Sequence, residues 1–356
     1  MDNFKVKYFL AANSCEGFVS VFKNCYDPQK GWKAYIIKGG PGTGKSSFMK
    51  FLAVKAQEKG IKTELFPCSS DPHSLDAVIF PEKKIAVMDG TAPHTADPDY
   101  PAVCETILNF GEFWDTDKLS DNSAEVIATT QKNKLLHRSA SRYMQSVGSL
   151  LEDNLKTACA CTDKVKTSIF ADKLCKKYIP KKGGEGYEWV RFLSGITPKG
   201  VVAFGNTVLN TCKNTVIIED EYGSASDIIM RKLREYALKN GYEIITVKNS
   251  FLPSTLIDHI IIPELSLAFV RESEYQHFKN DARRIHARRF VNSKQLHKSR
   301  ERIRFNKKAI RQFLISAATV LAEAKAVHDE LEKYYVSAMD FGALTDFANK
   351  FAEKLF

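Results

Sequence analysis

The sequence predicts an α/β protein in which one unit occurs twice, each copy being a parallel β-sheet domain with a long helical arm. Three observations predict this fold class. An apolar strand, a turn and a helix recur at a shift of 181 residues. In each copy the strands alternate with a helix, which favours a parallel sheet covered on both faces. After each copy, apolar residues recur every three or four positions, the period of a packed helix.

The repeat extends well beyond the shared turn. An apolar run at 35–38 precedes the glycine-rich segment 39–46, and a similar run at 216–219 precedes segment 220–227. The register continues through Gly60 with Gly241, Pro81-Glu82 with Pro263-Glu264, and Ile85-Ala86-Val87 with Leu267-Ala268-Phe269. Order, spacing and polarity agree over ~70 residues, which indicates a duplicated domain.

The elements of the first copy follow from its apolar runs. We expect strands at 34–38, 62–68 and 84–89, and a helix from about Lys45 to Glu58. Glycines and prolines between 180 and 200 are typical of a linker. The predicted boundaries are a nucleotide-binding-type core at 1–120, a helical arm at 121–180, a linker at 181–200, a degenerate core at 201–275 and a basic helical arm at 276–356.

Both arms carry an apolar stripe with steps of four and three residues. This 3.5-residue period is typical of a coiled-coil seam, so we expect two helical arms able to pack on each other or to form a dimer. The stripe comprises Leu136, Ala140, Tyr143, Val147 and Leu150 in the first arm, and Phe313, Ala317, Val320, Ala324, Val327, Leu331, Tyr334 and Ala338 in the second.

The composition indicates a soluble cytoplasmic protein. The chain has 356 residues, of which 44% are hydrophobic and 26% charged, and no run approaches the ~20 apolar residues of a membrane span. The eight cysteines contain no C-x-x-C pair, and Cys159 and Cys161 would point apart on a helix. We therefore expect free thiols in a reducing compartment, without zinc or disulfides.

The glycine-rich segment matches the pattern G-x-x-x-x-G-K-[ST] between a strand and a helix. Glycines allow backbone N–H groups to surround a phosphate, and the helix N-terminus adds partial positive charge. In this pattern Lys45 reaches the β- and γ-phosphates and the Ser46 hydroxyl binds Mg²⁺. The expected nucleotide-binding residues are Gly39, Gly40, Pro41, Gly42, Thr43, Gly44, Lys45, Ser46 and Ser47.

A carboxylate is expected near the metal, at the end of a neighbouring strand. Asp89 ends the apolar run 84–89, so Ser46 and Asp89 are the predicted Mg²⁺ ligands, Asp89 through water. The alternative is that Asp89 only opens a turn before Gly90. Together the two features predict ATP and Mg²⁺ as cofactors, with Lys45 and Asp89 in catalytic roles.

The second copy lacks these features. Acidic residues, Asp220, Glu221 and Asp227, stand where the first copy has two glycines and Ser46, and Arg271 stands where it has Asp89. Ala225 and Ser226 replace the last glycine and the lysine. Three acidic side chains facing the phosphates would repel them, so we expect the second copy to be structural or regulatory.

At these residues the chain resembles the P-loop NTPases, and more narrowly an uncharacterised bacterial family of tandem P-loop ATPases. The resemblance rests on Lys38–Ser46, on Cys68-Ser69-Ser70-Asp71 with Ser74-Leu75-Asp76, and on Asp89-Gly90-Thr91-Ala92-Pro93-His94 with Asp97-Pro98. It implies ATP binding and hydrolysis over essentially the whole chain, and the choice of ATP over GTP rests on it. Family members often keep both loops, whereas this chain has lost the second.

The residue that activates the attacking group is not evident. Many ATPases have a glutamate directly after the metal-binding aspartate, where this chain has Gly90. Asp71, after the second strand, could accept a proton from a substrate hydroxyl, as in a small-molecule kinase. His94 and Asp97 could sense the γ-phosphate or position water. Each of these residues could equally open or cap a turn.

The net charge of +10 is concentrated in one segment. Between Arg271 and Arg311 there are 14 basic and 4 acidic residues. These cations, interleaved with Phe290 and Phe305, could follow a nucleic-acid backbone. They could also form a solvated helix face, pair with the acidic second loop, or supply an arginine to the γ-phosphate.

Three functions therefore compete. The first, which we favour, is an ATPase whose nucleotide cycle moves the helical arms or a partner. The second is a phosphotransferase that acts on a small hydroxyl-bearing substrate. The third is a nucleotide-binding scaffold without useful turnover, or an ATPase coupled to nucleic acid through the 271–311 segment.

Overall fold

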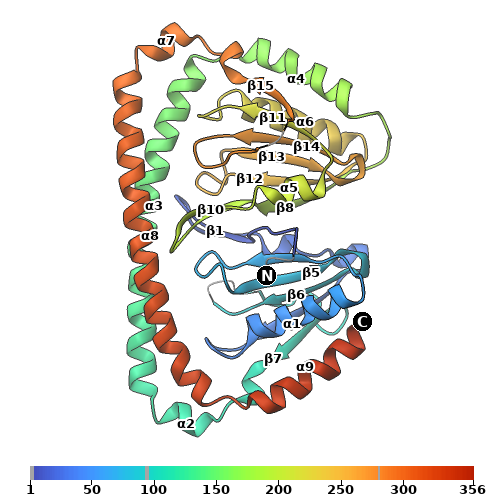
Figure 1. Cartoon of the computed structure of the whole chain (residues 1–356), viewed down its shortest axis with the longest axis vertical. Coiled ribbons are helices and arrows are strands. Elements are labelled where there is room, and N and C mark those ends of the chain that lie inside the picture. The colour runs from blue at the N-terminus through green and yellow to red at the C-terminus, as the bar shows by residue number, and fades with distance from the viewer. Residues whose placement is uncertain (1–3, 93–95, 280) are drawn as a thin grey trace.

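The structure, a computed structural model, describes residues 4–92, 96–279 and 281–356. It is an α/β fold with two mixed β-sheets, one above the other along the long axis, and a pair of long helices along one side (Figure 1). Across the first sheet the strands are β4 (Glu64–Pro67), β5 (Leu75–Phe80), β6 (Ile85–Asp89), β3 (Lys33–Lys38) and β7 (Glu105–Asn109).

One strand of this sheet corrects the expectation of parallel sheets. β5 runs antiparallel to both β4 and β6, whereas β3 is parallel to β6 and β7. A single turn at Pro81–Lys83, ended by Lys84 at a φ of 55°, joins β5 to β6. So short a connection can join only antiparallel neighbours. β5 lies outside the strands predicted from the sequence, so this hairpin was not expected.

The second sheet has the same arrangement and one further strand. Its strands in order are β15 (Arg283–His286), β11 (Asn214–Glu219), β14 (Leu267–Glu272), β13 (Ile257–Ile262), β12 (Glu243–Lys248) and β8 (Tyr187–Phe192). β13 is the antiparallel strand here. Two expected boundaries differ from the structure: the predicted linker 181–200 contains β8, and the predicted core end at 275 precedes β15.

The two sheets are joined through residues 6–9, which bond Leu65 of β4 on one side and Phe192 of β8 on the other. The Phe9 N–H donates to Phe192 O at 2.8 Å, and the Phe192 N–H donates to Phe9 O at 3.0 Å. Each phenylalanine leads into a hairpin: β1 (Ala11–Ser14) with β2 (Gly17–Ser20), and β9 (Ser194–Thr197) with β10 (Gly200–Ala203). One hydrophobic core continues across the junction and includes Tyr8, Phe9, Trp189 and Phe192.

The helical arms are α3 (Ser123–Ala160) and α8 (Arg300–Ser337), each of 38 residues. They run antiparallel and pack on each other over their length (Figure 1), so their apolar seams meet within one chain. Asn133 Nδ2 donates to Ala324 O at 2.8 Å near one end, and Asn306 Nδ2 donates to Asn154 Oδ1 at 2.9 Å near the other. The expected seam is buried at Ala140, Val147, Ala317, Ala324, Val327, Leu331 and Ala338.

The helix after each arm packs on the sheet of the other half. α4 (Lys164–Tyr178) follows the first arm but packs on α6 (Ser226–Lys239) of the second half. α9 (Phe341–Leu355) follows the second arm but packs on α1 (Lys45–Glu58). There Phe351 contacts Tyr35 and Phe48, with ring centroids 4.9 and 5.4 Å apart. This exchange carries the end of α8 to the glycine-rich turn of the first half.

Candidate functional site

The glycine loop, residues 39–46, connects β3 to the N-terminus of α1. Gly42 and Gly44 have φ values of 68° and 80°, the left-handed region that other residues adopt only with strain. The Thr43 hydroxyl donates to Gly40 O at 2.8 Å and closes the turn. The loop backbone therefore curls around the helix N-terminus, where unpaired N–H groups favour an anion.

Lys45 and Asp89 lie together at the mouth of this loop. The Lys45 ammonium donates to Gly39 O at 3.0 Å and to Gly40 O at 2.6 Å, and it lies 3.6 Å from Asp89 Oδ2. The two side chains are 12% and 16% exposed. Because β3 and β6 are adjacent and parallel, with Ile37 opposite Asp89, the ends of both strands reach the loop.

Ser46 and Asp89 supply the hydroxyl and carboxylate oxygens that suit a magnesium ion. The Leu75 N–H donates to Ser46 Oγ at 3.0 Å, and the Thr91 N–H donates to Asp89 Oδ1 at 2.9 Å. Within the described ranges, no group of three or more His, Cys, Asp or Glu side chains could hold a metal. A magnesium ion at this place would take its remaining ligands from phosphate oxygens and water.

The corresponding turn of the second half shows what such a loop binds. There the Asp220 carboxylate lies inside the turn and is 5% exposed. The N–H groups of Ala225 and Ser226 each donate to its Oδ2 at 2.8 Å, and that of Gly223 donates to its Oδ1 at 3.1 Å. Tyr222 N–H, at 3.3 Å from Oδ1, is a fourth donor. The backbone of this turn is therefore an anion site filled by its own side chain.

The acidic residues of the second loop do not all face a phosphate position, which corrects the sequence-based expectation. Glu221 forms an ion pair with Lys307 of α8. Asp227 accepts from the Ile257 N–H at 3.2 Å, as Ser46 does from Leu75, and pairs with Arg231. Repulsion by three carboxylates is thus not what closes this loop to phosphate, because Asp220 already occupies its N–H groups.

In the first loop, Gly39 stands where Asp220 stands in the second. No side chain of a described residue accepts from the N–H groups of Gly44 or Lys45, the counterparts of Ala225 and Ser226. These N–H groups at the start of α1 are thus left for an external anion. The sequence carries a signal for this difference, an aspartate replacing the first glycine, but it does not show where that aspartate points.

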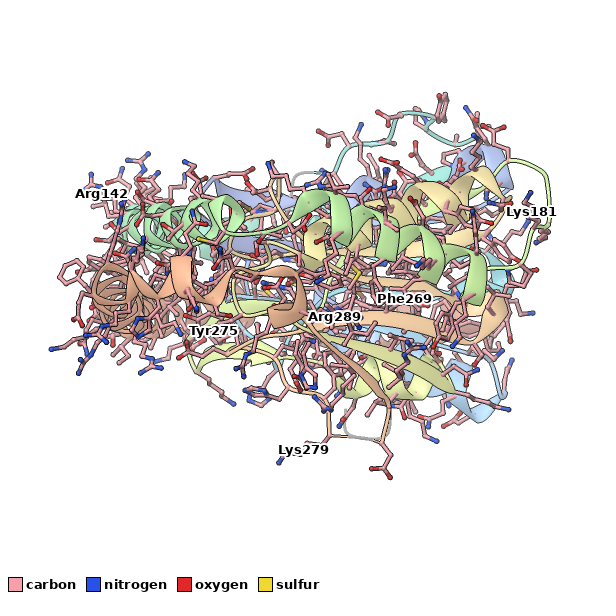
Figure 2. All side chains as sticks on the ribbon, turned by 90° about the horizontal axis from the view of Figure 1, so that it is seen from above. Arg142, Lys181, Phe269, Tyr275, Lys279 and Arg289 are labelled. Carbon is pink, nitrogen blue, oxygen red and sulfur yellow. The ribbon has the colours of Figure 1, made fainter. Side chains whose placement is uncertain are left out.

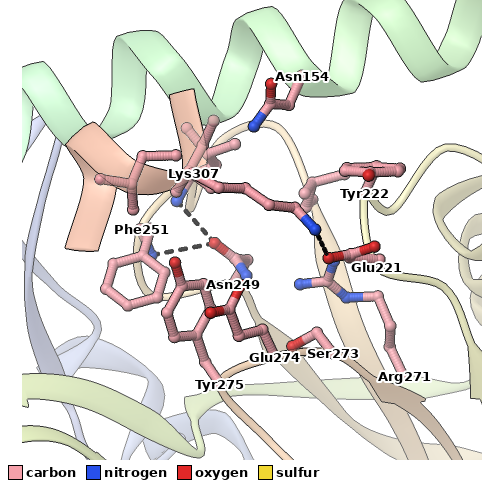
Figure 3. A pocket seen from close by; sticks show the side chains of 14 residues that line it. Asn154, Glu221, Tyr222, Asn249, Phe251, Arg271, Ser273, Glu274, Tyr275 and Lys307 are labelled. Carbon is pink, nitrogen blue, oxygen red and sulfur yellow. Dashed lines mark hydrogen bonds and ion pairs between the residues drawn. The ribbon is translucent and has the colours of Figure 1, made fainter. Parts of the chain in front are cut away.

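Arg271 replaces Asp89 in the second half and serves a structural ion pair. Its Nη2 lies 2.7 Å from Asp258 Oδ1, and both side chains are 8% exposed. Figure 3 shows Arg271 beside Glu221 and Lys307 in a pocket that α3, α8 and the second loop enclose. A paired arginine at this position leaves no carboxylate for a metal, so the second half lacks both parts of the predicted site.

The end of α8 covers the glycine loop, which sequence analysis could not foresee. A Cβ on Gly40 would lie 2.5 Å from the Tyr335 ring, and one on Gly42 would lie 2.9 Å from Glu332 O. These glycines are therefore also required for close packing of the helix.

Glu332 of α8 lies beside the glycine loop. The pKa of Glu332 is lowered by its hydrogen bond with His328, and also by Lys325 and the Gly42 N–H. A carboxylate of the arm thus lies beside the loop.

The other predicted catalytic residues have different surroundings. Asp71 accepts from the His73 N–H at 3.0 Å and from the Ser74 hydroxyl at 2.9 Å, and lies 3.5 Å from Lys325. Burial raises the pKa of Asp71, but these hydrogen bonds and the lysine outweigh it and leave the pKa below its usual value. His94 lies outside the described residues. Asp97 accepts from Lys38 at 2.7 Å and is 80% exposed.

Packing explains why no glutamate follows Asp89. A Cβ on Gly90 would lie 2.3 Å from Ile36 Cγ2 and 2.9 Å from Ala96 O. The Gly90 N–H also donates to Ile37 O at 2.9 Å, which ties this residue to the core strand. The position directly after Asp89 is therefore closed to any side chain.

The basic segment is partly neutralised. Arg302 pairs with Asp153, Arg311 with Glu274, and Arg284 with Glu219 and Glu272. Lys307, another cation of this segment, forms an ion pair with Glu221 of the acidic second loop. Pairing with this loop was one of the alternatives for the basic segment. The arginine side chains described here make no ion pair at the glycine loop.

Comparisons with protein-family models, with curated proteins and with solved structures give no match. Among the described residues, no helix has the length and apolar character needed to cross a membrane. All eight cysteines are free thiols. The function proposed below is therefore argued from the geometry of the two loops.

Proposed function

We propose that the chain is a magnesium-dependent ATPase of the P-loop type, built from two copies of one domain, in which only the first copy turns over nucleotide. The observation that carries the proposal is the contrast between the two loops. In the second loop four N–H groups hold the Asp220 carboxylate. In the first loop Gly39 brings no side chain to this place, so the N–H groups of Gly44 and Lys45 are left to a phosphate, and the Lys45 ammonium lies at the same loop.

The residues of the first loop have distinct roles in this proposal. The N–H groups of Gly42, Gly44 and Lys45 hold the phosphate oxygens, and the Lys45 ammonium moves from the loop carbonyls to the β- and γ-phosphates. Ser46 and Asp89 hold the magnesium ion, which neutralises phosphate charge when bound. The test is release of phosphate from ATP by the purified chain, which should require Mg²⁺.

A phosphotransferase is the second candidate, because Asp71 follows β4 at the same edge of the sheet as the glycine loop. The turn that begins at Asp71 leads to Leu75, whose N–H donates to the Ser46 hydroxyl oxygen. The hydrogen bonds and the Lys325 contact that lower the pKa of Asp71 make it a weak base. We expect Asp71→Asn to keep phosphate release within about threefold of the wild type. A loss of about 100-fold or more would instead assign Asp71 as the base that activates the attacking group, which is the role that a phosphotransferase needs.

Glu332 offers a test of whether the arm opposes nucleotide binding. Its carboxylate lies near the Gly42 N–H, so bound phosphate would meet a like charge. Glu332→Gln should tighten Mg-ATP binding by about fivefold, the effect of roughly 1 kcal/mol of repulsion at the solvent boundary. Glu330→Gln is the matched control, since Glu330 is exposed on the same helix. Equal affinities for both variants would contradict a contact between Glu332 and the nucleotide site.

A further inference from the structure

Two equivalent segments of the duplicated fold carry opposite charge. Residues 110–131 contain five acidic residues and one basic residue, whereas residues 287–308 contain nine basic residues and one acidic residue. Both segments form a four-residue turn, then a five-residue helix, then the start of a 38-residue helix. The backbone is the same, so folding alone does not require the inversion.

The two segments lie at opposite ends of the molecule. The acidic one includes α2 (Thr116–Ser120) and the start of α3, and the basic one includes α7 (Ser293–His297) and the start of α8 (Figure 1). Figure 2 looks onto the basic end, where Arg289 lies beside α4; its guanidinium is 4.8 Å from the Phe170 ring. One end of the long axis is therefore acidic and the other end is basic.

Several cations of the basic end are exposed and form no ion pair with a described residue. They are Arg288, Lys294, Lys298, Arg304 and Lys308. Arg300 pairs with its neighbour Glu301 and contacts His297, both on the same segment, and its side chain remains 64% exposed. Ion pairs within the fold therefore account for part of the charge, and the rest faces solvent, where it costs free energy through mutual repulsion.

The start of α8 arranges these cations in a row with an aromatic ring. Arg300, Arg304 and Lys308 are four residues apart, so they follow one face of the helix at intervals of about 6 Å. Phe305, beside Arg304, is 69% exposed. The equivalent positions of α3 hold Ser123, Ile127, Gln131 and Ala128. The start of α8 thus carries cations and an exposed ring that the start of α3 lacks, and these groups suit a ligand with negative charge and flat rings.

We propose that this basic end, residues 287–308, binds single-stranded nucleic acid, with phosphates on the cations of α7 and α8 and a base stacked on Phe305. Cationic tracks with exposed aromatic rings are how proteins bind single strands without reading sequence. A single strand supplies both partners in one repeating ligand, phosphates for the cations and flat bases for the exposed ring. This binding does not depend on the glycine loop, so it stands or falls separately from the proposed ATPase.

The test is fluorescence anisotropy with a labelled single-stranded DNA of about 20 nucleotides and no ATP. Replacing Arg300, Arg304 and Lys308 together by alanine should weaken binding at least tenfold at about 50 mM salt and lower the salt slope by about 2. Lys132, Lys134 and Arg138, exposed near the other end of the arm pair, give a control with the same charge loss. This control should bind within about twofold of the wild type.

Phe305→Ala separates stacking from charge. It should weaken binding of the single strand by about fivefold or more and leave the salt slope unchanged. The proposal is overturned if the triple variant of α8 and the control triple variant of α3 weaken binding equally, or if no strand binds at low salt. It is also overturned if a duplex binds more tightly than the single strand and Phe305→Ala leaves the affinity unchanged. It is also overturned if the basic end instead holds the acidic end of a second copy, seen as salt-sensitive self-association that the strand does not disrupt.

Discussion

Lys45→Ala should lower Mg²⁺-dependent phosphate release from ATP by about 100-fold or more. Removing one preorganised charge donor from a phosphoryl-transfer site has an effect of this size. The Lys45 ammonium lies within 3.0 Å of two loop carbonyls and 3.6 Å from Asp89, so it is already held where the phosphates would bind. Phosphate release, measured at saturating ATP, gives the direct comparison.

Lys55→Ala is the matched control for this prediction. Lys55 lies on the same helix, is partly exposed and pairs with Glu58 at 2.9 Å. Its removal also deletes one lysine from α1 but leaves the loop intact, and activity should stay at the wild-type level. Turnover that survives Lys45→Ala would assign the activity to another site or to a contaminant.

Asp220→Ala should lower the free energy of unfolding by about 3–5 kcal/mol, although Asp220 belongs to the second loop, which we expect to bind no nucleotide. The substitution leaves four backbone N–H groups without their acceptor in a buried turn, and each buried unpaired group is costly. It also removes a negative charge from the N-terminus of α6. Urea denaturation of the full chain measures the effect.

One control variant and the addition of phosphate establish the cause of this loss. Glu221→Ala removes the neighbouring carboxylate, whose partner Lys307 lies near the surface, and should cost less than about 1 kcal/mol. Added phosphate should restore part of the stability of Asp220→Ala by entering the vacated N–H groups. Equal losses in Asp220→Ala and Glu221→Ala, without rescue by phosphate, would show that the Asp220 carboxylate does not fill an anion site.

The sequence was most informative where a local pattern determines geometry. The glycine loop and the adjacent strand 84–89 allowed Lys45 and Asp89 to be placed together, because a loop after one strand and the end of its neighbour share one edge of a sheet. The 3.5-residue period likewise indicated which faces of the arms are apolar. Neighbours along the chain or along a helix face carry this information.

The features that were missed depend on contacts between distant segments. Periodicity indicates the apolar face of α8 but not that the end of this helix lies against the glycine loop, so the contact of Tyr335 with Gly40 was out of reach. β5 was not predicted from its short run LDAVIF, and its antiparallel pairing depends on neighbours that only the folded sheet brings beside it. Asp220 was recognised as acidic, but its inward rotamer follows from backbone N–H groups that only the folded turn brings together.

The most direct test of the account is a calorimetric titration of the full chain with Mg-ATP. One nucleotide should bind per chain, binding should require Mg²⁺, and Asp89→Asn should weaken it, whereas Glu221→Ala should leave both the stoichiometry and the affinity unchanged. Two nucleotides per chain would show that Asp220 does not close the second loop. No binding, or binding indifferent to Mg²⁺ and to Asp89, would contradict the assignment of the first loop as the nucleotide site.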